Sequence, residues 1–124
     1  MNVRARLYLA AALGGGIGTV LRGSAGAFVA GGPWVTMGIN WIGCLALGFF
    51  STWAVKRVPE TVRVGVGTGV LGGFTTFSAF SVDTLRMLQA GDVATAALYA
   101  AGSLVGGVLL AALGVRLARK GAGA

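Results

Sequence analysis

The chain has 124 residues, of which 56% are apolar, 23 are glycine and only 10% are charged. A typical soluble domain carries about 25% charged residues, so this composition indicates a chain that lies in a lipid bilayer. With no histidine and a single cysteine, Cys44, it excludes both a disulfide framework and a Cys/His metal site. The formal net charge of +7 does not indicate a nucleic-acid partner, because the Lys and Arg residues lie mostly at the ends of apolar runs, as in membrane proteins.

Four apolar segments are long enough to cross a bilayer, which takes about 20 residues each. They predict a single all-α domain over residues 1–124, with membrane spans at about 7–29, 34–55, 62–89 and 93–117. The start of the first segment resembles a signal peptide, because Arg4 and Arg6 precede an apolar run. The rest of the chain is equally apolar, so cleavage would not leave a soluble product.

The first segment carries Gly14 and Gly18, four residues apart, and Arg22 in its outer third. Glycines at this spacing favour close helix packing, although glycine is also simply common in membrane helices. A charged side chain at the depth of Arg22 is a functional hypothesis by default. The alternative is a long side chain that reaches back to the membrane surface.

The second segment places Thr36, Asn40 and Gly43 on one helical face, with Asn40 near its centre. An amide left unpaired in hydrocarbon is costly, so Asn40 needs a partner. It either hydrogen-bonds a neighbouring helix as a packing contact or lines a polar path. The broken helix that follows in the same chain favours the polar path.

The third segment is too long for one crossing helix. Its roughly 28 residues would span about 42 Å at ~1.5 Å per residue, whereas the hydrocarbon core is about 30 Å thick. We therefore predict two half-helices, at about 62–71 and 75–88, which meet near Gly72–Thr76. Irregular backbone at that depth must be buried in protein or line a cavity, and channels and transporters place ion sites at such breaks.

Polar and aromatic residues follow the break. Phe77 and Phe80 are three residues apart, and the partly positive edges of their rings could contact an anion, although such a pair usually faces lipid or core. Asp83 is placed to pair with Arg86 in a structural contact. In the fourth segment Tyr99 and Ser103 again share a face, where a serine often satisfies a carbonyl of its own helix.

Three motifs together resemble the small bacterial fluoride channels of the Fluc or CrcB family. They are residues 14–22 (GGGIGTVLR), residues 36–43 around Asn40, and the break at residues 72–81 (GGFTTFSAFS). The resemblance covers nearly the whole chain, and the motif at the break is its most specific part. One departure is Ala79, which replaces a position that is often Thr or Ser.

The resemblance implies a passive fluoride channel, not an enzyme, that lowers intracellular fluoride across the bacterial cytoplasmic membrane as an antiparallel dual-topology dimer with two pores. It places Arg22 in a vestibule and a structural Na⁺ at the dimer interface, on the backbone carbonyls of Gly72 and Thr75. It implies that the fluoride pore is lined by Asn40, Phe77, Phe80, Tyr99, Ser103, Thr36 and Ser78. Fluoride is small and tightly hydrated, so amide, hydroxyl and ring-edge donors without a fixed charge suit both its entry and its exit.

Two other functions remain open. A small four-span proton-coupled exporter needs a titratable carboxylate within a span, but the first two segments have none and Asp83 lies near a span end. The chain could instead be a non-conducting partner subunit of a heterodimeric channel. Such a subunit would not need the motif at the break.

The charge distribution favours one orientation. On a four-span topology, eight basic residues lie on the side of both termini: Arg4, Arg6, Lys56, Arg57, Arg63, Arg116, Arg119 and Lys120. The other side has only Arg22 and Arg86. Such a bias predicts that both termini are cytoplasmic, whereas a dual-topology homodimer needs little bias. We therefore favour pairing with a homologous subunit of opposite orientation over insertion of this chain in both directions.

Overall fold

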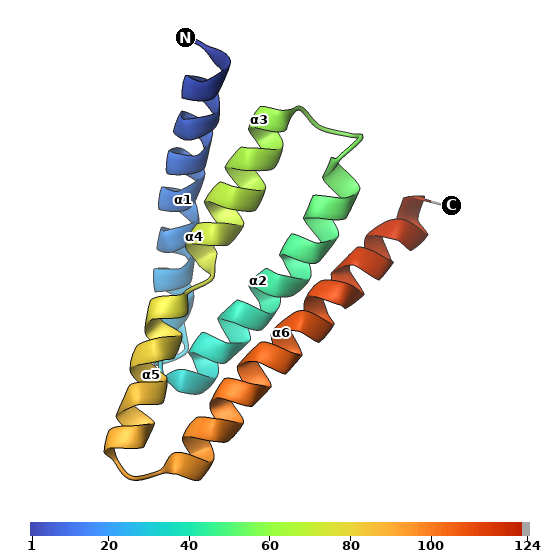
Figure 1. Ribbon diagram of the computed structural model, residues 1–124. Coiled ribbons are helices and arrows are strands. Elements are labelled where there is room, and N and C mark those ends of the chain that lie inside the picture. Colours follow the sequence, from blue (N-terminus) through green and yellow to red (C-terminus); the bar gives the residue numbers. More distant parts are fainter. Residues whose placement is uncertain (123–124) are drawn as a thin grey trace.

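The computed structural model describes residues 1–122, and within them every regular element is a helix. Three long helices frame a shorter, interrupted one (Figure 1). In chain order the elements are α1 (Val3–Phe28), α2 (Pro33–Ala54), α3 (Glu60–Arg63), the π-helix η1 (Val64–Leu71), α4 (Gly72–Phe74), α5 (Phe77–Gln89) and α6 (Val93–Ala122). The predicted four helical segments are confirmed, with α1 beginning a few residues earlier and α6 ending a few residues later than expected.

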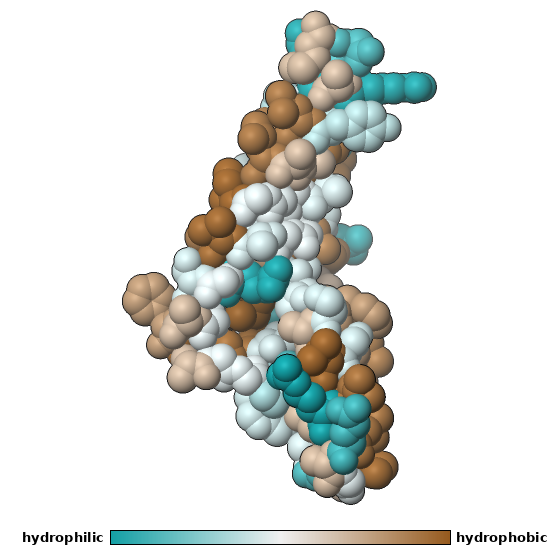
Figure 2. Space-filling model, turned by 90° about the vertical axis from the view of Figure 1, so that its left-hand side faces the viewer, coloured by the Kyte–Doolittle hydropathy of each residue, from teal (hydrophilic) through white to brown (hydrophobic). Residues whose placement is uncertain are grey.

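Two of the helices, α2 and α6, are long and apolar enough to cross a membrane. The glycines and Arg22 lower the hydropathy of α1, and the break divides the third segment into pieces that are each shorter than a span. The sides of the molecule are nevertheless apolar, because large side chains such as Leu13, Ile17 and Leu109 are more than half exposed. Figure 2 shows hydrophilic residues at the top of the molecule and in its lower part, with a smaller hydrophilic group about midway, and hydrophobic residues along the edges between them.

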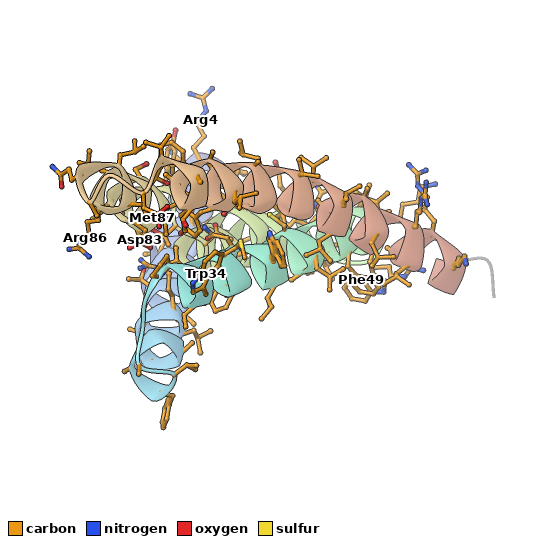
Figure 3. All side chains as sticks on the ribbon, turned by 90° about the horizontal axis from the view of Figure 1, so that it is seen from below. Arg4, Trp34, Phe49, Asp83, Arg86 and Met87 are labelled. Carbon is orange, nitrogen blue, oxygen red and sulfur yellow. The ribbon has the colours of Figure 1, made fainter. Side chains whose placement is uncertain are left out.

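Both termini lie at one end of the molecule, together with the loop between α2 and α3 (Figure 1). The loops that join α1 to α2 and α5 to α6 lie at the other end. This arrangement agrees with the predicted order of the segments, and it gathers the eight basic residues named above at one end. Seen from below, α1 runs at a wide angle to α2 and α6, and Arg4 projects away from the helices (Figure 3).

The break in the third segment is narrower than predicted. The chain is helical through Phe74, and only Thr75 (φ −77°, ψ 157°) and Thr76 (φ −145°, ψ 124°) are extended. The break lies within the predicted range Gly72–Thr76, but the predicted bounds of the half-helices, 62–71 and 75–88, are wrong there, because Gly72 is helical, with φ −65° and ψ −36°, and Thr75 is extended. Gly73 serves close packing instead, since a Cβ there would collide with the carbonyl oxygen of Gly15 on α1.

Glycines bring two helix pairs into backbone contact. On α1, a Cβ at Gly14 or Gly18 would collide with the carbonyl oxygens of Gly65 and Val70, respectively. On α2, a Cβ at Gly48 would meet a carbonyl of α6. Such close approach increases van der Waals contact where lipid offers no hydrophobic gain, so the packing role predicted for Gly14 and Gly18 is confirmed. Gly38 of α2, by contrast, has open space beside it.

Candidate functional site

Asn40 of α2 binds the break directly. Its Nδ2 donates to the carbonyl oxygen of Thr76 at 2.9 Å, and its Oδ1 accepts from the backbone N–H of the same residue at 2.7 Å. The second hydrogen of Nδ2 has no such role and remains available to a ligand. The two alternatives for Asn40 are therefore compatible, because one amide can serve both as a packing contact and as a donor.

Two backbone carbonyls just before the break accept hydrogen bonds from side chains. The carbonyl of Leu71 accepts from the backbone N–H and the hydroxyl of Thr75, each at 3.1 Å. The carbonyl of Gly73 accepts from Arg22 Nε at 3.2 Å and from Thr19 Oγ1 at 3.5 Å. The N–H of Thr76, which in a continuous helix would bond Gly72, is taken by Asn40.

Three carbonyl oxygens at the break consequently have no donor within residues 1–122. They belong to Gly72, Phe74 and Thr75. The described residues contain no cluster of three His, Cys, Asp or Glu side chains that could hold a metal ion, whereas the break offers these carbonyl oxygens. Such oxygens suit a hard cation, as in other broken membrane helices.

A central cavity of about 280 Å³ opens beside the break, between α2, α5 and α6. Four of the predicted pore residues line it: Asn40, Phe77, Phe80 and Ser103. The other described residues of the lining are also uncharged: Gly43, Cys44, Leu47, Thr75, Thr76 and Leu104. The hydroxyl oxygen of Ser103 is buried and has no hydrogen-bond partner in the described chain. A buried hydroxyl without a partner is costly, so this one is suited to bind a ligand.

An aromatic stack supports one wall of the central cavity. Phe80 stacks on Tyr99 with ring centroids 5.4 Å apart, and Phe77 lies 5.8 Å from Phe80. Trp34 meets the other side of Tyr99 edge-on at 5.9 Å. Tyr99 is fully buried and lies behind Phe80, whereas the ring of Phe77 is 78% exposed. The predicted pair of phenylalanines therefore does share a face, with one ring supported and one projecting outward.

Asp83 of α5 anchors this stack. Its Oδ2 accepts a hydrogen bond from the hydroxyl of Tyr99 at 3.3 Å. The partner of Asp83 in the described structure is thus Tyr99 rather than Arg86, contrary to the expected pairing along the helix. Figure 3 shows Asp83 and Trp34 near the same end of the molecule, where Arg86 extends outward from α5.

A second, smaller cavity of about 190 Å³, the Arg22 hollow, lies on the other side of the break. Arg22 and Thr36 line it together with small residues of the loop between α1 and α2, including Gly31 and Gly32. The hydroxyl of Thr36 donates to the carbonyl oxygen of Gly32 at 3.2 Å. Thr76 lines both this hollow and the central cavity, so the break separates the two spaces.

The predicted pore residues therefore fall into four groups. Asn40, Phe77, Phe80 and Ser103 meet at the central cavity, and Thr36 lies at the Arg22 hollow. Tyr99 supports the wall from behind. Ser78 lines neither space, and its hydroxyl lies 3.2 Å from that of Thr76.

Sequence reasoning did not single out Thr76, although it joins both spaces and bonds Asn40 through its backbone. No side-chain signal could have shown this, because the bonds use the peptide N–H and C=O. A third space, the long groove of about 570 Å³, runs along α2 and η1 and includes both Gly72 and Thr75. Thr75 lines the groove as well as the central cavity, so the predicted cation ligands lie at an open face.

Comparison with known proteins identifies close relatives. Residues 9–115 match the family model described as CrcB-like protein, Camphor Resistance (CrcB). The chain is 47% identical over 116 residues to the fluoride-specific ion channel FluC of Novosphingobium aromaticivorans. The alignment covers 87% of this chain and 92% of the relative. It is 46% identical over 116 residues to FluC of Thermus thermophilus, with 89% and 91% covered.

A third relative is the fluoride-specific ion channel FluC 1 of Moorella thermoacetica, 44% identical over 121 residues, with 91% of this chain and 86% of the relative covered. All three names describe ion channels, which are not enzymes. Both the family model and the relatives span the break and the residues of the central cavity.

Proposed function

The chain belongs to the CrcB family, and on this premise we propose that it is a fluoride-selective channel that exports fluoride passively across the bacterial cytoplasmic membrane and lowers intracellular fluoride. The central cavity is the observation that carries the proposal. It brings an amide hydrogen of Asn40, the unpartnered hydroxyl of Ser103 and the ring of Phe80 to one space without a charged side chain.

This donor set matches the chemistry of fluoride. A small, strongly hydrated anion needs donors that replace its water, and Asn40 and Ser103 supply them. The edge of the Phe80 ring adds a partly positive surface. The absence of Lys and Arg from the lining residues named above avoids a fixed charge that would trap the ion, since conduction requires binding weak enough for release.

We further infer that the functional unit is an antiparallel dimer with each chain crossing the membrane four times. Phe77 is 78% exposed although it lies beside the central cavity, so its outer face needs a neighbour to complete a wall. The long groove is likewise open along α2 and η1. A second subunit that packs there would close both surfaces and bring two breaks together.

The carbonyls at the break fit a structural Na⁺ at that interface. The oxygens of Gly72 and Thr75 have no donor within the described chain, and both residues line the open groove. One chain supplies only part of a cation's coordination shell, so a second break would complete it. The ion, when bound, would hold the two subunits together through their carbonyl dipoles and would not move with fluoride.

The identity of the second subunit follows from the charge distribution. Eight basic residues at the end with both termini favour a single orientation, with that end in the cytoplasm. An antiparallel partner would then be a homologue with the opposite bias.

Efflux from liposomes that hold the purified chain tests the channel proposal. We expect rapid loss of trapped fluoride, measured with a fluoride electrode, and retention of chloride. Equal rates for both ions would contradict selectivity, and a strict need for a proton gradient would favour the exporter. If the chain alone is inactive but conducts when co-purified with a homologue, it is a subunit of a heterodimer.

Reporter fusions after Ala124 test the orientation separately. A cytoplasmic signal alone is expected. Comparable cytoplasmic and external signals would contradict the heterodimer and support insertion in both directions.

A further inference from the structure

We propose that Arg22 is a positioning residue for the cation site at the break, acting through its Nε–H donor rather than through its charge. The inference rests on the sodium part of the proposed function and adds a residue to it. Its basis is one contact, the hydrogen bond of 3.2 Å from Arg22 Nε to the carbonyl oxygen of Gly73.

That contact decides which carbonyls remain free. At the end of a helix the last carbonyls lack intrahelical donors, and here they belong to residues 71–74. Thr75 donates a hydrogen bond to the carbonyl oxygen of Leu71, and Arg22 donates one to the carbonyl oxygen of Gly73. Gly72 and Phe74, on either side of Gly73, are left without a donor, as is Thr75 beyond them.

The break is thus held from two sides. Asn40 of α2 fixes Thr76 through both backbone groups, and Arg22 of α1 fixes Gly73. Phe74 and Thr75 lie between the anchored residues Gly73 and Thr76, and Gly72 immediately precedes Gly73. Loss of the hydrogen bond from Arg22 to Gly73 would let the short helix α4 rotate. A rotation there changes the direction of the Gly72 and Thr75 carbonyls together.

The length of the side chain allows the donor and the charge to be separated. In glutamine, Nε2 occupies the same position along the chain as Nε of arginine, so Arg22→Gln keeps the donor and removes the charge. In methionine a methyl group stands at that position, so Arg22→Met removes both. In lysine a methylene stands there, so Arg22→Lys keeps the charge and displaces the donor.

The measurement is the thermal unfolding midpoint of the purified, assembled channel across a range of NaCl, with choline chloride holding ionic strength constant and with no fluoride present. A ligand that binds only the folded state raises the midpoint once its concentration exceeds its dissociation constant. The apparent sodium dissociation constant of each variant follows from these curves, independently of transport.

We expect Arg22→Met and Arg22→Lys to raise the apparent dissociation constant for sodium by about tenfold, the effect of losing one hydrogen bond of about 1.4 kcal/mol. Arg22→Gln should stay within about threefold of the wild type, because a neutral donor is retained. Thr19→Val, which removes the longer bond to the same carbonyl, should give a smaller shift in the same direction.

Three results would overturn the proposal. If Arg22→Gln and Arg22→Met shift equally while Arg22→Lys resembles the wild type, the charge is what matters, as a vestibule role implies. A tighter sodium constant in both neutral variants would show that the guanidinium repels the cation. If no variant shifts, Arg22 does not position the site. Should Arg22→Met fail to assemble at any sodium concentration, the contrast between the glutamine and lysine variants still decides.

The wild-type curves separate this proposal from the channel itself. A midpoint that does not depend on sodium would overturn both the sodium site and the role of Arg22. Fluoride efflux from the same preparation would then show whether the channel proposal stands without them.

Discussion

The two sides of the break are stabilised in different ways. Upstream, η1 and α4 pack against α1 through glycines, with backbone meeting backbone at Gly14, Gly18 and Gly73. Downstream, α5 packs through the stack of Phe80 on Tyr99 and the hydrogen bond between Tyr99 and Asp83. The first interface is closed within one chain, whereas the second leaves Phe77 exposed at its edge.

This difference separates the scaffold from the site. A glycine interface has no side chains to repack, so it fixes the position of the break relative to α1. An aromatic interface presents rings and hydroxyls to a cavity and can be completed by another subunit. Changes upstream should therefore act on folding, and changes downstream mainly on transport.

The largest effect is expected from Gly18→Ala. The added Cβ would collide with the carbonyl oxygen of Val70 and would lie 2.8 Å from the backbone nitrogen of Phe74, neither of which can move aside. We expect a loss of about 3 kcal/mol or more in unfolding free energy, because overpacking against backbone forces helix displacement. Urea or thermal unfolding in detergent measures it.

The matched control is Gly16→Ala, on the same helix with open space around the new Cβ. It should be neutral or slightly stabilising, because alanine is the better helix former. Equal destabilisation by the two variants would contradict the close contact between α1 and α4.

Asn40→Ala is expected to lower both the stability of the fold and the rate of fluoride transport. It leaves the N–H and the C=O of Thr76 without partners, which costs about 2 kcal/mol. Fluoride efflux should fall by about tenfold or more, since the loss of a donor worth 1.4 kcal/mol or more corresponds to that factor. Reduced stability with full efflux would return Asn40 to a packing role alone.

Phe80→Leu and Phe77→Leu compare the supported ring with the exposed one. Loss of the stack on Tyr99 should cost about 1 kcal/mol beyond the change in buried area. Phe77→Leu should hardly change the stability of a single chain, because its ring is 78% exposed. Both should slow fluoride efflux if the second subunit completes the wall, and unchanged efflux in Phe77→Leu would contradict that interface.

Ser103→Ala should separate transport from stability most cleanly. Its hydroxyl has no partner in the described chain, so its removal should leave the unfolding free energy within about 0.5 kcal/mol or raise it slightly. Fluoride efflux should nevertheless fall several-fold. Destabilisation without a change in efflux would show that the hydroxyl bonds its own helix instead of an ion.

The smallest effect on stability is expected at Asp92, in the loop between α5 and α6. Hydrogen bonds donated by the Thr95 hydroxyl and by the Thr95 backbone N–H, the latter at 3.1 Å, lower the pKa of the Asp92 carboxyl. A lowered folded-state pKa means that this cap stabilises α6 above the ordinary pKa of the carboxyl and is lost as pH falls through the lower value. A slight decrease in the thermal midpoint is expected below about pH 4.

Asp92→Ala removes this component, so the wild type and the variant should differ at neutral pH and converge in acid. Contributions from the rest of the chain are common to both proteins and cancel in the difference. A difference that grows as pH falls would contradict the cap.

The sequence by itself determined the four segments, their order and the presence of a break, because apolar length and local composition are properties of neighbouring residues. It also indicated the shared faces of Phe77 with Phe80 and of Tyr99 with Ser103, which follow from helical spacing. The exact position of the break was not predictable. Glycine is a poor helix former, so the local pattern ended the first half-helix before Gly72 and Gly73, yet both are helical and Gly73 packs against Gly15 of α1.

The tertiary structure alone decided which polar groups are satisfied. Asn40 and Thr76 are 36 residues apart, and Arg22 and Gly73 are 51 residues apart, yet these pairs determine which carbonyls and donors remain free. A hydrogen bond consumes a group only when a distant segment reaches it at the right distance and angle. Local pattern cannot supply that information, so the residues that could contact an ion were predictable, whereas the atoms left available to it were not.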